Sequence, residues 1–78
     1  MSTLLQLPLD VPATIVCIDT LPELTRRLAA MGLRCGKQVV VLRRSWLGGP
    51  LQLRLGSTEL MLRRVHAAEI QVQAAGGL

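Results

Sequence analysis

The chain has 78 residues, half of them hydrophobic, with nine lysines and arginines against five acids and a net charge of +4. A chain of this length forms one domain and buries only about 60% of the surface that its unfolded form exposes, which argues against a deep catalytic cleft. Its apolar runs are far shorter than the roughly 20 residues of a membrane span, and a signal-peptide pattern is absent. We therefore expect a single soluble, cytoplasmic domain over residues 1–78.

The first predicted element is a strand over residues 12–18, where β-branched side chains cluster before Asp19. Alternation along this strand places Ile15 and Cys17 on one face, so Cys17 is expected inside the fold and inert. Two cysteines without Cys-x-x-Cys spacing are too few for a disulfide framework, which favours free thiols. Cys35, in a glycine-flanked corner, is expected to be the more accessible of the two.

A helix of about three turns is predicted next. Thr20 and Glu23 have the spacing of a capping box, in which each side chain bonds the other residue's backbone N–H group. Gly32 is expected to end the helix in the left-handed conformation, and Gly36 to let the chain turn into the next strand. An apolar stripe recurs along the helix at spacings of three and four: Leu21, Leu24, Leu28 and Met31.

Alternating hydrophobic patterns then predict three antiparallel strands, over residues 37–44, 51–55 and 59–63. Gly56 and Ser57 join the last two strands as a hairpin, and residues 45–50 form a turn-rich surface connection. Residues 67–69 are expected to form one helical turn, residues 70–72 a last strand, and residues 73–78 a frayed tail.

The predicted fold is therefore mostly β with one short helix, built from about five antiparallel strands. Several short strands joined by tight glycine turns favour a small barrel, because closure removes the unpaired edges of an open sheet.

The sequence offers little for catalysis. His66 is the only histidine, and no serine, cysteine and acid are spaced to suggest a catalytic triad. No glycine-rich loop ends in the Lys-Ser or Lys-Thr of a phosphate-binding loop. We therefore expect no enzymatic activity and no required cofactor.

A metal site can be built from three candidate ligands. His66 and Glu69 share a face if the residues between them are helical, and Cys35 is a third ligand if it lies nearby. Thiolate and imidazole ligands suit zinc or ferrous iron. The alternative is that His66 is an exposed turn residue and Glu69 a solvated charge. Any metal held here is expected at the surface, bridging two molecules in a weak homodimer.

A partner surface is the other candidate site. All nine basic residues fall between Arg26 and Arg64, where Glu59 is the only acid, and this asymmetry favours an anionic partner. The Arg pairs are expected on neighbouring strands, and two bulky apolar residues in the 45–50 connection are expected to be partly exposed. The candidate interface residues are Arg43, Arg44, Trp46, Leu47, Arg63 and Arg64.

Alternatives to this interface remain open. The arginines can be the solvated exterior of a barrel, and Trp46 can fold back as a lid over one open end. RNA is the alternative partner, although RNA-binding barrels usually stack bases on aromatic side chains and Trp46 is the only aromatic residue. We therefore do not expect nucleic acid as the main partner.

The spacing of small residues resembles the family of ferrous iron transport protein A (FeoA), from about Leu7 to Val72. Asp10 stands where that family usually has glycine, and Cys35 where it often has proline. The matching residues are Arg27-Leu28, Met31-Gly32-Leu33-x-x-Gly36-x-x-Val39, Gly49-Pro50 and Leu62-Arg63-Arg64-x-x-Ala67-x-x-Ile70-x-Val72.

The resemblance implies a small cytosolic SH3-like barrel without enzymatic activity. It implies an accessory protein of bacterial ferrous iron uptake, which docks on the cytoplasmic part of a membrane transporter with a GTPase domain and is thereby recruited to the inner face of the membrane. A small RNA-binding barrel protein is the alternative from a different class.

Overall fold

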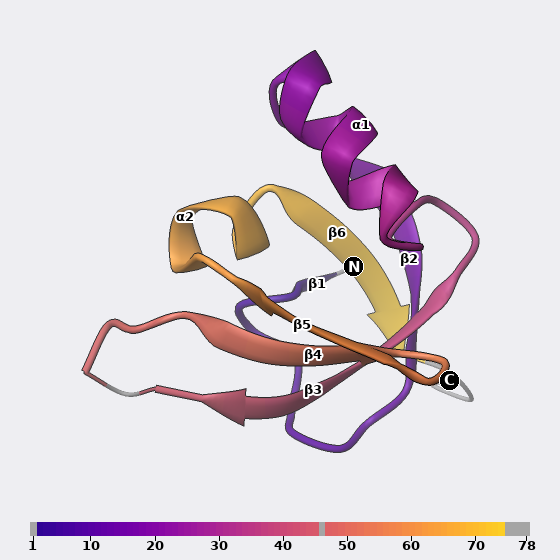
Figure 1. The fold of residues 1–78 in the computed structure, drawn as a ribbon. Helices are drawn as coiled ribbons and strands as arrows, with labels where there is room; N and C mark the ends of the chain where they lie inside the picture. Colours follow the sequence, from indigo (N-terminus) through magenta and orange to yellow (C-terminus); the bar gives the residue numbers. More distant parts are fainter. Residues whose placement is uncertain (1, 46, 75–78) are drawn as a thin grey trace.

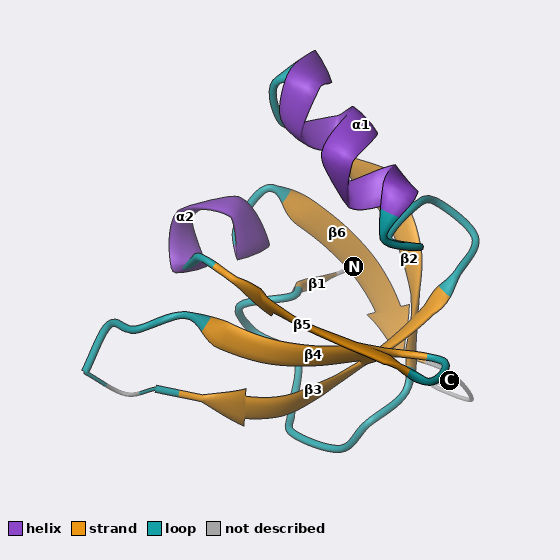
Figure 2. Cartoon of the chain, in the orientation of Figure 1, coloured by secondary structure: helices purple, strands orange, loops and turns teal. Residues whose placement is uncertain are grey.

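The computed structural model describes residues 2–45 and 47–74. One antiparallel sheet of six strands, with the order β1-β6-β2-β3-β4-β5, curls around the core, and two short helices accompany it (Figures 1 and 2). The elements are β1 (Ser2–Thr3), β2 (Ala13–Ile18), α1 (Pro22–Ala30), β3 (Gln38–Arg44), β4 (Leu51–Leu55), β5 (Thr58–Leu62), α2 (Arg64–Ala67) and β6 (Ile70–Ala74).

The predicted mostly β fold of antiparallel strands is confirmed, with three corrections. A sixth strand, β1, pairs with β6, and a second helix, α2, precedes β6. No pairing joins β1 to β5 among the described residues, so these strands are the two edges of a sheet that is not closed into a barrel. Closure is one way to manage an edge, and a very short edge strand such as β1 is another.

The core follows the alternation of the strands. Inward residues of β3 and β4 are fully buried, whereas their neighbours face outward or lie half-buried. The buried residues are Leu4, Leu7, Ala13, Ile15, Leu28, Leu33, Val39, Val41, Leu51, Leu53, Leu55, Leu62, Ala67, Ile70 and Val72. No buried residue in the described parts of the chain is polar or charged, so the core is stabilised by apolar burial.

The prediction that Cys17 is buried is wrong, because β2 contains a bulge. Against β6, Ile15 lies opposite Val72 but Cys17 lies opposite Gln71, so Val16 is an extra residue that shifts the register. A one-residue shift moves the following side chains to the other face. Cys17 is therefore exposed, as is Cys35, and both thiols are free.

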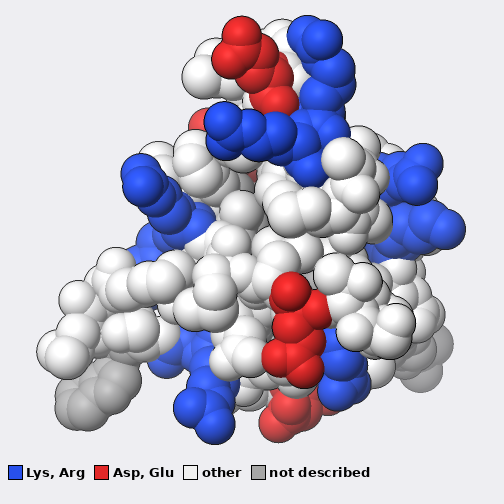
Figure 3. All heavy atoms as spheres, in the orientation of Figure 1, with Lys and Arg blue, Asp and Glu red and all other residues white. Residues whose placement is uncertain are grey.

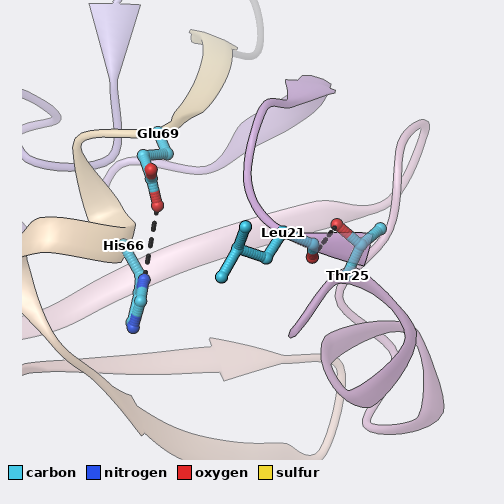
Figure 4. A network of polar contacts seen from close by, with 4 residues as sticks. All are labelled: Leu21, Thr25, His66 and Glu69. Carbon is cyan, nitrogen blue, oxygen red and sulfur yellow. Dashed lines mark hydrogen bonds and ion pairs between the residues drawn. The ribbon is translucent and has the colours of Figure 1, made fainter. Parts of the chain in front are cut away.

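The predicted capping box is also wrong. The residue before a proline avoids the helical region, so Leu21 is extended, with φ −60° and ψ 142°, and serves as the N-cap of α1. Pro22 lacks an N–H group and is well suited to the first helical position. No side chain caps this end of the helix. Instead, the Thr25 hydroxyl donates a 3.1 Å hydrogen bond to the Leu21 carbonyl (Figure 4).

The far end of α1 confirms the prediction for Gly32, whose φ is +95°. Its N–H group donates to the Ala29 carbonyl at 3.0 Å, and the Leu33 N–H group donates to the Leu28 carbonyl at 2.9 Å. These two bonds form a Schellman motif, and its usual apolar contact is supplied by two buried leucines, Leu28 and Leu33.

Gly36 also takes a positive φ, +89°. Lys37 N–H donates to the Arg34 carbonyl at 3.2 Å, while Gly36 N–H donates to the Ile15 carbonyl at 2.8 Å and Ile15 N–H donates to the Lys37 carbonyl at 2.9 Å. This is a type II turn that leads into a bulge with glycine at its left-handed position. The corner thus aligns β3 with β2.

The N-terminal segment, which the sequence left unassigned, covers part of the core. Leu4 and Leu7 are buried, and the Leu4 N–H group donates to the Ile70 carbonyl at 3.0 Å. Asp10, at the position where glycine is usual in the resembling family, has a φ of +63° and donates its N–H group to the Val41 carbonyl at 2.9 Å. A left-handed backbone explains why glycine suits that position.

The C-terminal elements differ from the prediction in their limits. The helical turn α2 begins at Arg64 rather than at residue 67. Strand β6 continues through Gln73 and Ala74, which pair with Thr14 and Ala13 of β2. These two residues therefore belong to the sheet and not to a frayed tail, while residues 75–78 lie outside the described residues. In the described parts of the chain, α1 has nine residues and α2 has four, and neither could span a membrane.

Candidate partner-binding surface

A hollow of about 500 Å³ lies beside the loop between β3 and β4, and we call it the β3–β4 hollow. Leu47 of this loop is 89% exposed, although its side chain is large and apolar. A single exposed leucine is common on soluble proteins, but this one lies in a loop next to a hollow and an exposed arginine, Arg43. The residues that line the hollow are Arg43, Arg44, Ser45, Gly49, Pro50, Gln52 and Met61.

Three of these residues form one row across the sheet. Arg43 of β3 lies opposite Gln52 of β4, and Gln52 lies opposite Met61 of β5. Side chains directly opposite each other on one face are in contact distance, so a cation, an amide and a thioether stand side by side. Met61 is 59% exposed. Met61 was not among the predicted interface residues, although its outward place in the alternation of β5 indicates an exposed apolar residue.

Arg43 and Arg44 have different surroundings. Leu42 is an extra residue in β3 relative to β4, and this bulge leaves Arg43 exposed and Arg44 opposite the buried Leu51. The Arg44 Nη2 atom donates to the Leu7 carbonyl, while its Nε atom is buried without a hydrogen-bond partner in the described structure. Arg43 is thus free to meet a partner, whereas Arg44 fastens the N-terminal segment to β3.

The second arginine pair lies elsewhere than expected. Arg63 is the N-cap of α2 and Arg64 its first residue, so both follow the end of β5. Strand β4 separates β3 from β5, and the two arginine pairs therefore do not lie on neighbouring strands. Arg63 is exposed and Arg64 half-buried. Trp46, the sixth predicted interface residue, lies outside the described residues.

Two of the three candidate metal ligands come together. The His66 Nδ1 atom lies 3.3 Å from the Glu69 Oε1 atom, and both side chains are partly exposed, at 30% and 39% (Figure 4). Cys35 lies in the turn before β3. Among the residues that the structure describes, no three His, Cys, Asp or Glu side chains are grouped to hold a metal. His66 and Glu69 offer one imidazole and one carboxylate, which is half of a usual tetrahedral zinc shell.

Charge is distributed unevenly over the surface. Figure 3 shows Lys and Arg side chains around the margins of the viewed face, with uncharged surface between them and fewer acidic side chains. Glu59 accepts a 2.8 Å hydrogen bond from the neutral Gln52 amide and lies opposite Arg54. The surface therefore favours a partner with excess negative charge.

Comparison with known proteins connects this fold to one family. A sequence model described as the FeoA domain matches residues 2–74. No curated protein matches the chain in sequence at a significant level.

Several solved structures are similar to the chain over nearly its whole length. Iron(II) transport protein A of Clostridium thermocellum is 31% identical with a TM-score of 0.87, over 96% of this chain and 46% of that one. The FeoA protein of Chlorobium tepidum is 30% identical with a TM-score of 0.86, over 92% and 69% of the two chains. The chain thus spans less than half of the Clostridium protein.

A third structure adds the fold type. FeoA of Stenotrophomonas maltophilia is 28% identical with a TM-score of 0.79, over 94% and 91% of the two chains, and is described as a procaryotic SH3 domain protein complexed with zinc. The predicted SH3-like fold is therefore confirmed, with the open sheet described above. The family match over residues 2–74 and the structural similarity agree with the resemblance seen in the sequence, and the chain belongs to the FeoA family.

Proposed function

We propose that this protein is a cytosolic accessory protein of bacterial ferrous iron uptake. In this proposal it docks on the cytoplasmic part of the membrane iron transporter, which carries the GTPase domain, and is recruited to the inner face of the membrane. Family membership supports the role in iron transport. The role is a binding role, and the chain itself is proposed to catalyse no reaction.

The single observation that carries the docking surface is Leu47, 89% exposed beside the β3–β4 hollow. Exposed Arg43 lines the same hollow and provides the charge for an acidic partner. Arginine is enriched among the few residues that carry most of the energy of an interface, and the buried centre of an interface is more apolar than its rim. We therefore place the transporter contact on the β3–β4 loop and its hollow.

The experiment measures binding of the transporter's isolated cytoplasmic domain by calorimetry. Leu47→Ala is expected to weaken binding about tenfold or more, because an apolar anchor is lost. Leu21→Ala is the matched control, since Leu21 is 73% exposed but is the N-cap of α1 and not part of the β3–β4 loop. The free energy of unfolding of both variants should be within about 0.5 kcal/mol of the parent value, as is usual for surface substitutions.

The proposal fails if the parent protein does not bind the domain. If Leu47→Ala and Leu21→Ala bind as tightly as the parent, the contact lies on another surface. Total RNA is tested in parallel, and an RNA affinity that falls steeply with salt would favour the alternative function as an RNA-binding barrel.

We propose a surface metal as an accessory feature of the same protein. His66 and Glu69, with Cys35 if it approaches them, would bind zinc or ferrous iron shared between two copies, so that two pairs complete a four-ligand shell. The relative described as complexed with zinc supports this idea. Zinc-dependent dimerisation, measured by sedimentation and lost in His66→Ala, is the expected result, and a monomer at saturating zinc would contradict it.

A further inference from the structure

A second hollow, of about 370 Å³, separates α1 from the β5–α2 segment, and we call it the α1–β5 groove. Its two walls come from parts of the chain that are far apart in sequence, one face of α1 with the C-cap residue Met31, and the end of β5 with α2. Figure 1 shows where these elements lie. The residues that line it are Leu24, Arg27, Leu28, Met31, Met61, Leu62, Arg63 and His66.

The groove has an apolar floor, but polar atoms contribute slightly more than apolar ones to its exposed lining. Leu28 and Leu62 are buried in the core, whereas Met31 is 43% exposed and Met61 is 59% exposed. Exposed methionines on both walls are unusual for a solvated surface. Their flexible thioether side chains adapt to differently shaped apolar groups and are often used at binding surfaces. The groove can therefore accept one large apolar side chain.

The rim of the groove is positively charged. Arg27 on α1 and Arg63 at the start of α2 are both exposed, and no acidic side chain is among the described residues that line the groove. Of the acids in the neighbouring elements, Glu69 contacts His66 and Glu59 accepts a hydrogen bond from Gln52. Glu23 lies one turn before Arg27 on α1, and no ion pair between them is present in the described residues. Two guanidinium groups on opposite walls thus lack an acidic partner within the lining of the groove.

We propose that the α1–β5 groove binds a protein segment in which a large apolar side chain is flanked by acidic residues. The apolar side chain would enter between Met31 and Met61, and the carboxylates would meet Arg27 and Arg63. Charge complementarity favours this partner over a lipid surface or RNA, because the groove combines an apolar floor with separate cations and contains no aromatic platform. This inference goes beyond the transporter contact proposed above, since it concerns a different surface and does not require that partner.

Met61 connects the two surfaces, because it lines both the α1–β5 groove and the β3–β4 hollow. Its side chain is the ridge between them, with Arg43 on one side and Arg27 on the other. A partner bound in either hollow can therefore contact Met61, which also lines the other one.

The test uses a synthetic peptide with a central leucine pair flanked by glutamates. A second peptide carries lysines in place of the glutamates. The acidic peptide is added to the full chain labelled with ¹³C at the methionine methyl groups, and NMR is used to follow the Met31 and Met61 signals. We expect saturable shifts of both signals with the acidic peptide and none with the basic one.

Matched charge variants identify the groove. Arg26 and Arg27 are adjacent exposed residues of α1, but only Arg27 lines the groove. Arg27→Gln should weaken peptide binding about fivefold or more, and Arg26→Gln less than about twofold, because only one of the two meets the peptide. Glutamine has nearly the same helix propensity as arginine, so neither substitution should disturb α1. Equal melting temperatures confirm that they are folded.

An apolar pair of variants tests the second half of the proposal. Met61→Gln should weaken peptide binding, while Val65→Gln, at a 62% exposed residue outside the groove, should not. The proposal is overturned by an acidic peptide that does not bind at millimolar concentration, by equal binding of the basic peptide, or by equal losses in the Arg26 and Arg27 variants. Failure of the transporter domain to bind would overturn only the function proposed above, because the peptide experiment contains no transporter.

Discussion

The positive φ of Gly36 makes the corner between α1 and β3 sensitive to the handedness of any residue that replaces this glycine. Gly36 has a φ of +89°, and a Cβ atom added there would meet no atom within 4 Å. The effect of alanine is therefore conformational and not steric. An L-residue in the left-handed region costs about 1–2 kcal/mol, while alanine regains about 0.4–1 kcal/mol by restricting the unfolded chain. The midpoints of these two ranges differ by roughly 0.8 kcal/mol, and Gly36→Ala should lower the stability by about that amount.

D-alanine at the same position should have the opposite effect. Its mirror-image preference matches the positive φ of Gly36, so only the gain from the unfolded chain remains, about 0.4–1 kcal/mol. For a domain of this size 1 kcal/mol corresponds to about 4–8 °C in Tm. The L-alanine protein should melt about 3–6 °C below the parent and the D-alanine protein about 2–8 °C above it.

The assay is calorimetric melting of three chains made by total chemical synthesis, with glycine, L-alanine or D-alanine at Gly36. The three chains differ by no more than one methyl group, so burial and charge are matched. Equal Tm values for the L-alanine and D-alanine proteins would show that residue 36 is not held at positive φ. The turn from Arg34 to Lys37 would then not be a type II turn.

Three further predictions follow from single residues. Asp10 has a φ of +63°, so Asp10→Gly should raise the stability by up to about 1 kcal/mol in urea unfolding, and a loss would contradict the left-handed backbone. Cys17 and Cys35 are both exposed and should both react rapidly with a thiol reagent in the folded protein, which mass spectrometry can follow; slow labelling of Cys17 would restore its predicted burial. Leu53 is fully buried, so Leu53→Ala should lower the free energy of unfolding by about 2–5 kcal/mol, and a loss below about 1 kcal/mol would show that the side chain is not in the core.

The elements that the sequence predicted well are those with a strong and uninterrupted period. Val39 and Val41 in β3, and Leu51, Leu53 and Leu55 in β4, lie in strands with the predicted alternation, and these residues are buried. Period-two alternation is a direct consequence of strand geometry, so it needs no knowledge of the partner strand.

Features that depend on a distant segment were not predictable in the same way. Gln73 and Ala74 are weak strand formers by themselves, and they are strand residues because β2 supplies partners for them. The α1–β5 groove likewise exists only because the fold brings Arg27 and Met31 opposite Met61 and Arg63. Neither the charge pattern nor the hydrophobic period of the sequence predicts that α1 lies next to the β5–α2 segment.

The two arginines that end β3 show why the candidate interface could be predicted only in part. Alternation from Val39 and Val41 alone would turn Arg43 inward and Arg44 outward, but the bulge at Leu42 reverses the two faces. Because the neighbours are the same residue type, neither composition nor pattern distinguishes the two registers, and a shift of one residue decides which arginine meets solvent. Arg44 then bonds the Leu7 carbonyl, which secures the buried N-terminal segment, and Arg43 is left at the β3–β4 hollow. The bulge thus assigns one arginine to the stability of the fold and the other to the proposed contact.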